Sequence, residues 1–131
     1  MIEIKDVANS QLSKRFLEKV AQKVLQGEKE KLDISIVLLK QSEIRTINRK
    51  YRKKDVPTDV LSFRYDNAGE IALCPFIIRK YAKKLKITFK KNLSLVLIHG
   101  ILHLVGYDHE KSIKEAKRME IKQNYYLNKL T

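Results

Sequence analysis

All three histidines of the chain lie within one stretch of eleven residues, HGILHLVGYDH, which runs from residue 99 to residue 109. His99 and His103 are four residues apart, so on a helix their rings project from one face, one turn apart. Gly106 can end such a helix in the left-handed conformation and turn the chain back. His109 can then point at the same spot. The spacing predicts three neutral imidazoles around one point, which is a zinc site with an open fourth position for water.

These residues also allow other interpretations. His99 and His103 could be core histidines bonded to backbone carbonyls, with His109 at the surface. We favour the metal site, because burial of two unpaired imidazoles costs free energy and a bound metal removes that cost. Asp108, beside His109, has two roles open to it: it can orient a ligand as a hydrogen-bond acceptor, or it can cap the next helix.

The residue after the first histidine distinguishes this stretch from a known peptidase pattern. The spacing H-x3-H-x5-H, with glycine three residues before the last histidine, is similar to that of the metzincin peptidases. Those enzymes have a glutamate directly after the first histidine, which acts as the general base. Here that position is Gly100. The pattern therefore predicts the ligand geometry of a metzincin without its base.

The elements that must position these residues alternate along the chain. Strands are expected over residues 1–7, 32–39, 60–63 and 70–73, the last two joined by a turn at residues 66–69. Helices are expected between Ser10 and Gly27, after Ser42 as far as Tyr51, and over residues 75–86, 90–106 and 111–130. The helix over residues 90–106 is apolar on almost every side and should be central and buried. This order predicts an α+β fold, in which helices pack on a small mixed β-sheet and a glycine turn follows a metzincin-like zinc helix.

The charge of the chain points to a polyanionic partner. Its formal net charge is +13, with basic clusters at residues 50–54 and 79–91. Such a surface attracts RNA or DNA first and an anionic membrane second. Lysines that only solvate helix faces are the alternative, since bulk charge alone does not identify a partner.

Length and composition predict a single domain over residues 1–131. No run of 18 uncharged apolar residues is present, so no membrane span is expected. The first residues lack the basic-then-apolar pattern of a secretory signal. Cys74 is the one cysteine, which excludes an internal disulfide and favours a reducing cytoplasm.

Two blocks of the sequence resemble a known family. HGILHLVGYDH closely resembles the signature H-G-x-L-H-L-x-G-Y-D-H of the YbeY family, which are bacterial endoribonucleases and ribosomal RNA maturation factors. The block INRKYRKKDVPTDVLSF, from Ile47 to Phe63, resembles the family's N-x-x-Y-R-x-K-D-x-P-T-D-V-L-S-F. Two departures stand out: the family often has G-D-I where this chain has Gly69-Glu70-Ile71, and often has proline where this chain has Arg64.

The resemblance implies a zinc-dependent, single-strand-specific endoribonuclease domain over residues 1–131. It implies one zinc ion per chain, held by His99, His103 and His109. The implied partners are single-stranded RNA, ribosomal RNA and the small ribosomal subunit, with no membrane. The implied work is maturation of the 3′ end of the small-subunit RNA and ribosome quality control in the cytoplasm. The resemblance also matches the family's arginine to Arg52.

The chemistry of the remaining residues leaves choices open. Arg52 is permanently charged and forked, so it suits a phosphodiester and its more negative transition state. The alternatives for Arg52 are an ordinary surface position or a salt bridge with Asp55 or Asp59. The general base is open among a zinc-bound hydroxide, Glu70 and the 2′-hydroxyl of RNA.

The aromatic residues near this block also have two interpretations. Tyr51, Phe63 and Tyr65 can stack on unpaired bases, although aromatics at such spacing more often belong to the core.

Three classes of function follow from these observations. Metal-dependent hydrolysis of RNA is the first. A zinc-dependent peptidase or other metallohydrolase is the second, against which Gly100 argues. A ribosome-associated RNA-binding factor with structural zinc is the third.

Overall fold

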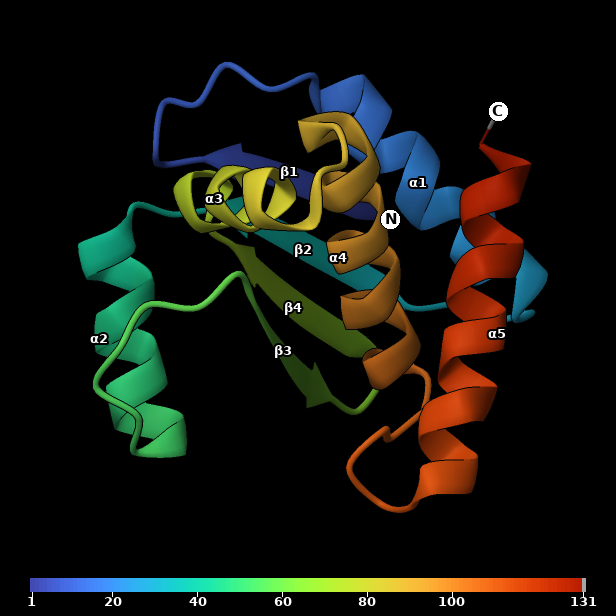
Figure 1. Cartoon of the computed structure of the whole chain (residues 1–131). Helices are drawn as coiled ribbons and strands as arrows, with labels where there is room; N and C mark the ends of the chain where they lie inside the picture. Colours follow the sequence, from blue (N-terminus) through green and yellow to red (C-terminus); the bar gives the residue numbers. More distant parts are fainter. Residues whose placement is uncertain (131) are drawn as a thin grey trace.

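The computed structural model describes residues 1–130, and in that range it contains four strands and five helices. The strands are β1 (Ile2–Asp6), β2 (Asp33–Leu38), β3 (Val60–Tyr65) and β4 (Ala68–Leu73). The helices are α1 (Lys14–Gly27), α2 (Gln41–Arg52), α3 (Pro75–Leu85), α4 (Phe89–Leu104) and α5 (Ile113–Lys129). Figure 1 shows the helices packed around one sheet, which confirms the expected α+β fold.

The four strands form one mixed sheet in the order β1-β2-β4-β3. β1 and β2 are parallel, β2 and β4 are parallel, and β3 pairs antiparallel with β4. β3 is therefore an edge strand, and its outer edge has no partner strand within residues 1–130. Unpaired backbone N–H and C=O groups along such an edge remain available to other molecules.

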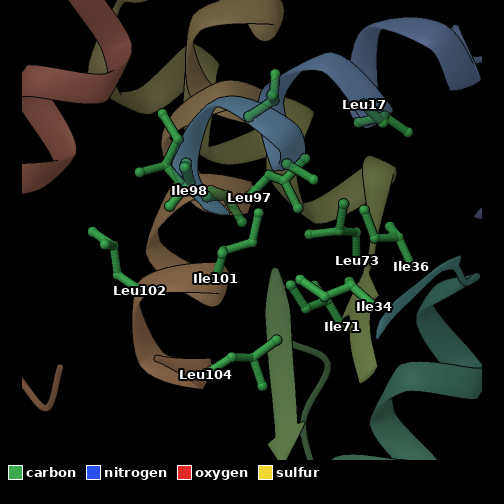
Figure 2. Close-up of a cluster of buried hydrophobic side chains, with 14 of the residues drawn as sticks. Leu17, Ile34, Ile36, Ile71, Leu73, Leu97, Ile98, Ile101, Leu102 and Leu104 are labelled. Atoms are coloured by element: carbon green, nitrogen blue, oxygen red, sulfur yellow. The ribbon is translucent and has the colours of Figure 1, made fainter. Parts of the chain in front are cut away.

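The two faces of the sheet are covered by different helices. Alternate strand residues such as Ile36 and Ile71 belong to a core cluster with α1 and α4, part of which Figure 2 shows. Leu61 and Ala72 belong instead to a second cluster that includes Ile44 of α2. α1 and α4 thus bury one face of the sheet, and α2 covers part of the other face, where some strand side chains stay exposed.

α4 is the central helix of the fold, as its apolar sequence predicts. The hydroxyl of its N-cap, Thr88, accepts a hydrogen bond from the N–H of Lys91 at 3.1 Å. The helix ends at Leu104, and Gly106 follows with a φ of 109°, a conformation that favours glycine. α5 returns alongside α4 (Figure 1). The helix and glycine turn expected for the metal site are therefore present.

Helix starts are the main local difference from the sequence-based expectations. α1 begins after Ser13, because the Asp6 carboxylate accepts hydrogen bonds from the N–H groups of Ser10 and Gln11, both at 2.9 Å, and holds them in a loop. α2 begins at Gln41, where Glu43 Oε1 accepts a hydrogen bond from the N–H of Lys40 at 2.8 Å. α1 is thus capped by a later serine, Ser13, and α2 starts two residues before the expected Ser42.

In the part of the chain that the structure describes, no helix has the length and apolar character needed to cross a bilayer.

Candidate metal centre

The three histidines converge as their spacing predicts. His99 and His103 lie on α4, and His109 lies beyond the Gly106 turn. One potential ligand atom from each lies within 4.8 Å of the others, and Nδ1 of His109 is 3.0 Å from Nε2 of His103. Zinc–nitrogen bonds of 2.0–2.1 Å in tetrahedral geometry place ligand nitrogens about 3.3 Å apart. The three side chains can therefore hold a metal ion after small ring movements.

The environment keeps the two helical imidazoles neutral. Burial lowers the pKa of His99, and the hydrogen bond with Gln123 only partly opposes that effect. Burial also lowers the pKa of His103, and the neighbouring rings of His99 and His109 lower it further. Metal binding requires the neutral imidazole, so at pH 7 these two side chains are in the form that can act as ligands.

Gln123 of α5 fixes the orientation of the His99 ring. Its Oε1 lies 2.6 Å from Nδ1 of His99. With the amide oxygen as acceptor, the hydrogen is on Nδ1, and the lone pair of Nε2 is left for a metal. Sequence reasoning missed this residue, because Gln123 belongs to another helix and nothing in its local pattern marks it.

The turn that carries His109 is anchored at two points. Oδ1 of Asp108 accepts a hydrogen bond from the N–H of Glu110 at 3.0 Å, while Ser112 caps α5. Asp108 therefore does not cap α5. It stabilises the turn itself, and its charge partly opposes the larger effect of burial, which lowers the pKa of His103. The hydroxyl of Tyr107 donates a hydrogen bond to Oε1 of Glu28 at 2.8 Å, which ties the turn to the end of α1.

Gly100 allows the ligand helix to pack closely on β3. Ser62 Oγ donates a hydrogen bond to the carbonyl oxygen of Gly100 at 3.0 Å. A Cβ at residue 100 would lie 3.1 Å from Ser62 Oγ and 3.2 Å from Cγ2 of Val60. The position that holds the base in the metzincins is thus a buried packing contact here, where any side chain would require Ser62 or Val60 to shift by a few tenths of an ångström.

The histidines line a cleft of about 510 Å³ along the free edge of β3. α4 and its turn form one wall, and the end of α2 contributes to the other. The side chains most relevant to chemistry in the cleft are Tyr51, Arg52, Asp59, Arg64, Asp108 and Glu110, in addition to the three histidines.

Arg52 is the last residue of α2, and it lines this cleft. Its Nη2 lies 3.8 Å from Oε1 of Glu110, and the same oxygen lies 3.9 Å from Nε2 of His109. The Arg52–Glu110 pair is long and exposed, so it contributes little to stability and leaves Arg52 available. Asp55, a possible partner from the sequence, is held instead by Arg45 at 2.9 Å.

The aromatic residues are more exposed than expected. Tyr51 is 60% exposed and Tyr65 is 55% exposed, so the core interpretation is wrong for both. Phe63 is half-buried, and the Tyr51 ring meets it edge to face with centroids 5.3 Å apart. Tyr51 and Phe63 line the cleft, whereas Tyr65 is not part of its lining.

Glu70 lies outside the cleft. It pairs in register with Phe63 and so shares the sheet face that α2 covers, away from α4. The carboxylates that do line the cleft are Asp59, Asp108 and Glu110. Glu110 was missed by sequence reasoning, since its proximity to Arg52 depends on the meeting of α2 with the turn after α4.

Comparisons with known proteins point to one family. The sequence profile described as "Endoribonuclease YbeY" matches residues 2–131. Endoribonuclease YbeY of Thermotoga maritima is 40% identical over 122 residues, which cover 82% of this chain and 81% of that protein. Endoribonuclease YbeY of Persephonella marina is 38% identical over 125 residues, which cover 88% of this chain and 82% of that protein.

A solved structure has a similar fold and a related sequence. The solution structure of TM1509 from Thermotoga maritima superposes with a TM-score of 0.73 at 37% sequence identity. The match covers 99% of this chain and 89% of the other. With its two signature blocks forming the two walls of one histidine-lined cleft, the chain belongs to the Endoribonuclease YbeY family.

Proposed function

We propose that this protein is a zinc-dependent, single-strand-specific endoribonuclease that matures the 3′ end of small-subunit ribosomal RNA and takes part in ribosome quality control. We further propose that it forms one domain over residues 1–131 and works in the cytoplasm. The observation that carries the activity is the convergence of three histidine ligand atoms within 4.8 Å, in a cleft that also contains Arg52.

Zinc is the metal that best suits these residues. Three imidazole nitrogens form a common ligand set of catalytic zinc, whereas magnesium and calcium prefer oxygen ligands. When bound, zinc supplies a Lewis acid for a phosphoryl oxygen and lowers the pKa of a coordinated water to about 7. Gln123 holds the His99 ring for this ligand role through its contact with Nδ1.

The composition of the cluster favours chemistry over a purely structural zinc. Within residues 1–130 the cluster contains the three histidines and no fourth side chain of a metal-binding type. Structural zinc sites are closed by four protein ligands, and catalytic sites keep one position open. The cluster also borders a cleft large enough for a substrate.

The other cleft residues suit RNA. We infer that the guanidinium of Arg52 binds the scissile phosphate and stabilises the charge that develops on it. The exposed ring of Tyr51 can stack on an unpaired base beside that phosphate. Asp59 and Glu110 line the cleft and replace Glu70 as candidates for accepting a proton from the attacking oxygen.

A peptidase is the less favoured function. Its general base would occupy residue 100, but this chain has glycine there, which supplies no acid or base, and Ser62 and Val60 already pack closely against it. The net charge of +13 also favours a phosphate polymer over a peptide.

The decisive experiment compares substrates and metal content together. The purified protein is incubated with single-stranded RNA, duplex RNA and a peptide library, each with and without a chelator. We expect cleavage of single-stranded RNA alone, its loss with the chelator and its return when zinc is added. Elemental analysis should find one zinc per chain, and the double variant His99→Ala, His103→Ala should contain none.

Two results would contradict the proposal. Full zinc content in the double variant would place the metal elsewhere, and RNA cleavage that survives chelation would exclude a metal-dependent mechanism. The rRNA assignment has a separate test, in which the substrate is small-subunit RNA with an extended 3′ end. Cleavage at random single-stranded positions, with no preference for that end, would argue against it.

A further inference from the structure

A long segment of the chain contains basic residues without any acidic ones. Residues 71–107 include seven lysines and arginines but none of the chain's 15 aspartates and glutamates. Most of α4 is buried, so the charge of this segment appears on α3 and at the start of α4. The seven residues, which we call the α3 basic surface, are Arg79, Lys80, Lys83, Lys84, Lys86, Lys90 and Lys91.

The positive charge of this surface is not neutralised within the protein. All seven side chains belong to exposed residues, and none forms an ion pair with any residue in the range 1–130. The opposite side of α3 is apolar and buried, with Ile77, Ile78 and Ala82 in the interior. The helix therefore presents a fixed row of unpaired cations to solvent, which suits a polyanion.

Exposed aromatic rings are interleaved with these cations. Phe76 is 60% exposed and Tyr81 is 38% exposed, both on α3. The guanidinium of Arg79 lies 4.0 Å from the ring centroid of Phe89, which joins α3 to the first turn of α4. Nucleic-acid surfaces combine cations that follow the phosphates with aromatic faces that stack on bases. RNA, the substrate class in the name of the matching family, offers both phosphates and unpaired bases to such a surface.

This surface is separate from the histidine cleft. None of the seven basic residues lines the cleft. Figure 1 shows α3 beside the start of α4, whereas the histidines lie towards the other end of that helix. At 1.5 Å per residue, Lys90 is about 20 Å from His103 along the helix axis. An RNA must therefore extend beyond the scissile phosphate to touch both places.

We propose that the α3 basic surface is a second RNA-binding site, which holds the backbone of the RNA that flanks the cleaved phosphodiester. The proposal rests on the proposed RNA substrate and adds a contact outside the catalytic cleft. Such a site increases affinity for long RNA without taking part in chemistry. Its effect should appear in KM and in the salt dependence of binding, with little change in kcat.

The test uses two variants with the same change in net charge. The first is the triple variant Lys80→Glu, Lys83→Glu, Lys84→Glu. The matched control is Lys19→Glu, Lys23→Glu, Lys31→Glu, which changes exposed lysines outside the surface. Each is measured on single-stranded RNA of about 25 nucleotides and on RNA of about 4 nucleotides, which spans only roughly 10 Å when stacked, about half of the distance between Lys90 and His103.

We expect the first variant to bind the long RNA at least about tenfold more weakly than the control at low salt. Its slope of log affinity against log salt should be shallower by about 2, because three phosphate contacts are lost. Its cleavage of the short RNA, and its kcat on the long RNA, should equal those of the control. Circular dichroism and zinc content verify that both variants are folded.

Three outcomes would overturn the inference. Equal weakening in both triple variants would mean that only net charge matters, unchanged binding would mean that the surface does not contact RNA, and slower cleavage of the short RNA would mean that it acts on the cleft. Binding is measured without reference to cleavage, so the test is distinct from that of the proposed function. A protein that binds RNA through α3 but does not cleave it would contradict only the enzymatic proposal.

Discussion

Arg64 is bonded to the end of the ligand helix: its Nη1 donates a hydrogen bond to the carbonyl oxygen of Leu104 at 2.6 Å. Its Nε donates another to the carbonyl oxygen of Asp66 at 2.7 Å, within the β3–β4 turn. A cation at the C-terminus of α4 donates a hydrogen bond to a free carbonyl and interacts favourably with the negative end of the helix dipole. The arginine that stands where the family often has proline thus joins the β3–β4 hairpin to the helix that carries His99 and His103.

Replacement of Arg64 by alanine should therefore lower stability. We expect Arg64→Ala to reduce the free energy of unfolding by about 1 kcal/mol, since a charged hydrogen bond to a helix carbonyl is lost. Chemical denaturation of the metal-free protein measures the effect. Arg15→Ala, at an exposed position of α1, is the control and should change little. Equal midpoints for the two variants would show that the Arg64 bonds do not stabilise the fold.

Gln123 should determine how tightly the metal binds. Gln123→Ala removes the acceptor for Nδ1 of His99 and leaves that ring free to rotate. Loss of such a contact typically weakens metal affinity about 10- to 100-fold. Competition with a chelator measures the zinc dissociation constant, and the exposed neighbour Asn124→Ala is the matched control. If Gln123→Ala and the parent hold zinc equally well, the orienting role is wrong.

Arg52 should act on the transition state. Arg52→Lys keeps the charge but loses the two-pronged geometry, so the rate should fall about 100- to 1,000-fold while zinc stays bound. The measurement is single-turnover cleavage at saturating single-stranded RNA. Arg49→Lys, whose guanidinium is 3.7 Å from Asp55, is the control on the same helix. A rate within about threefold of the parent would remove Arg52 from the catalytic set.

Tyr51 should contribute stacking on an unpaired base. Tyr51→Ala should weaken binding of short single-stranded RNA by about 1–3 kcal/mol, while Tyr51→Phe should retain most of the affinity. Tyr65→Ala is the control, because Tyr65 is exposed but does not line the cleft. Equal losses for Tyr51→Ala and Tyr65→Ala would mean that stacking at the cleft is not specific to Tyr51.

Glu28 should make stability depend on pH in the acid range. Burial by itself raises the pKa of Glu28, but hydrogen bonds from Tyr126, Tyr107 and Lys122 outweigh burial and lower it below its usual value. A carboxyl whose pKa is lowered in the folded state stabilises the fold above its unfolded pKa. That contribution is lost as pH falls through the folded pKa.

The measurement is the free energy of unfolding from pH 7 down into the acid range. At pH 7 we expect Glu28→Gln to be less stable than the parent by about 1–2 kcal/mol, because hydrogen bonds to a charged group become neutral ones. The gap should close as pH falls below the folded pKa of Glu28. Glu120→Gln, at an exposed position, should show no such gap. A pH-independent difference for Glu28→Gln would contradict the assignment.

The sequence by itself determined the features that depend on local rules. The spacing of four between His99 and His103, with Gly106 beyond them, required only helix periodicity and the one residue type that turns easily to positive φ. The apolar character of residues 90–106 likewise predicted a buried helix, because exposure of such a segment to water costs free energy whatever the rest of the fold is. The metal ligands and their helix could therefore be predicted.

Only the tertiary structure decided which distant residues meet these ligands. Arg52 approaches Glu110 and His109 because α2 and α4 lie on opposite faces of the sheet and come together over the edge of β3. Gln123 reaches His99 because of the way α5 packs on α4. These contacts follow from the packing of whole elements, in which side-chain volumes and sheet order select one arrangement among many. No local periodicity encodes that arrangement. The ligands were therefore evident from the sequence, and the family resemblance indicated Arg52, but the contacts made by Gln123 and Glu110 were not evident.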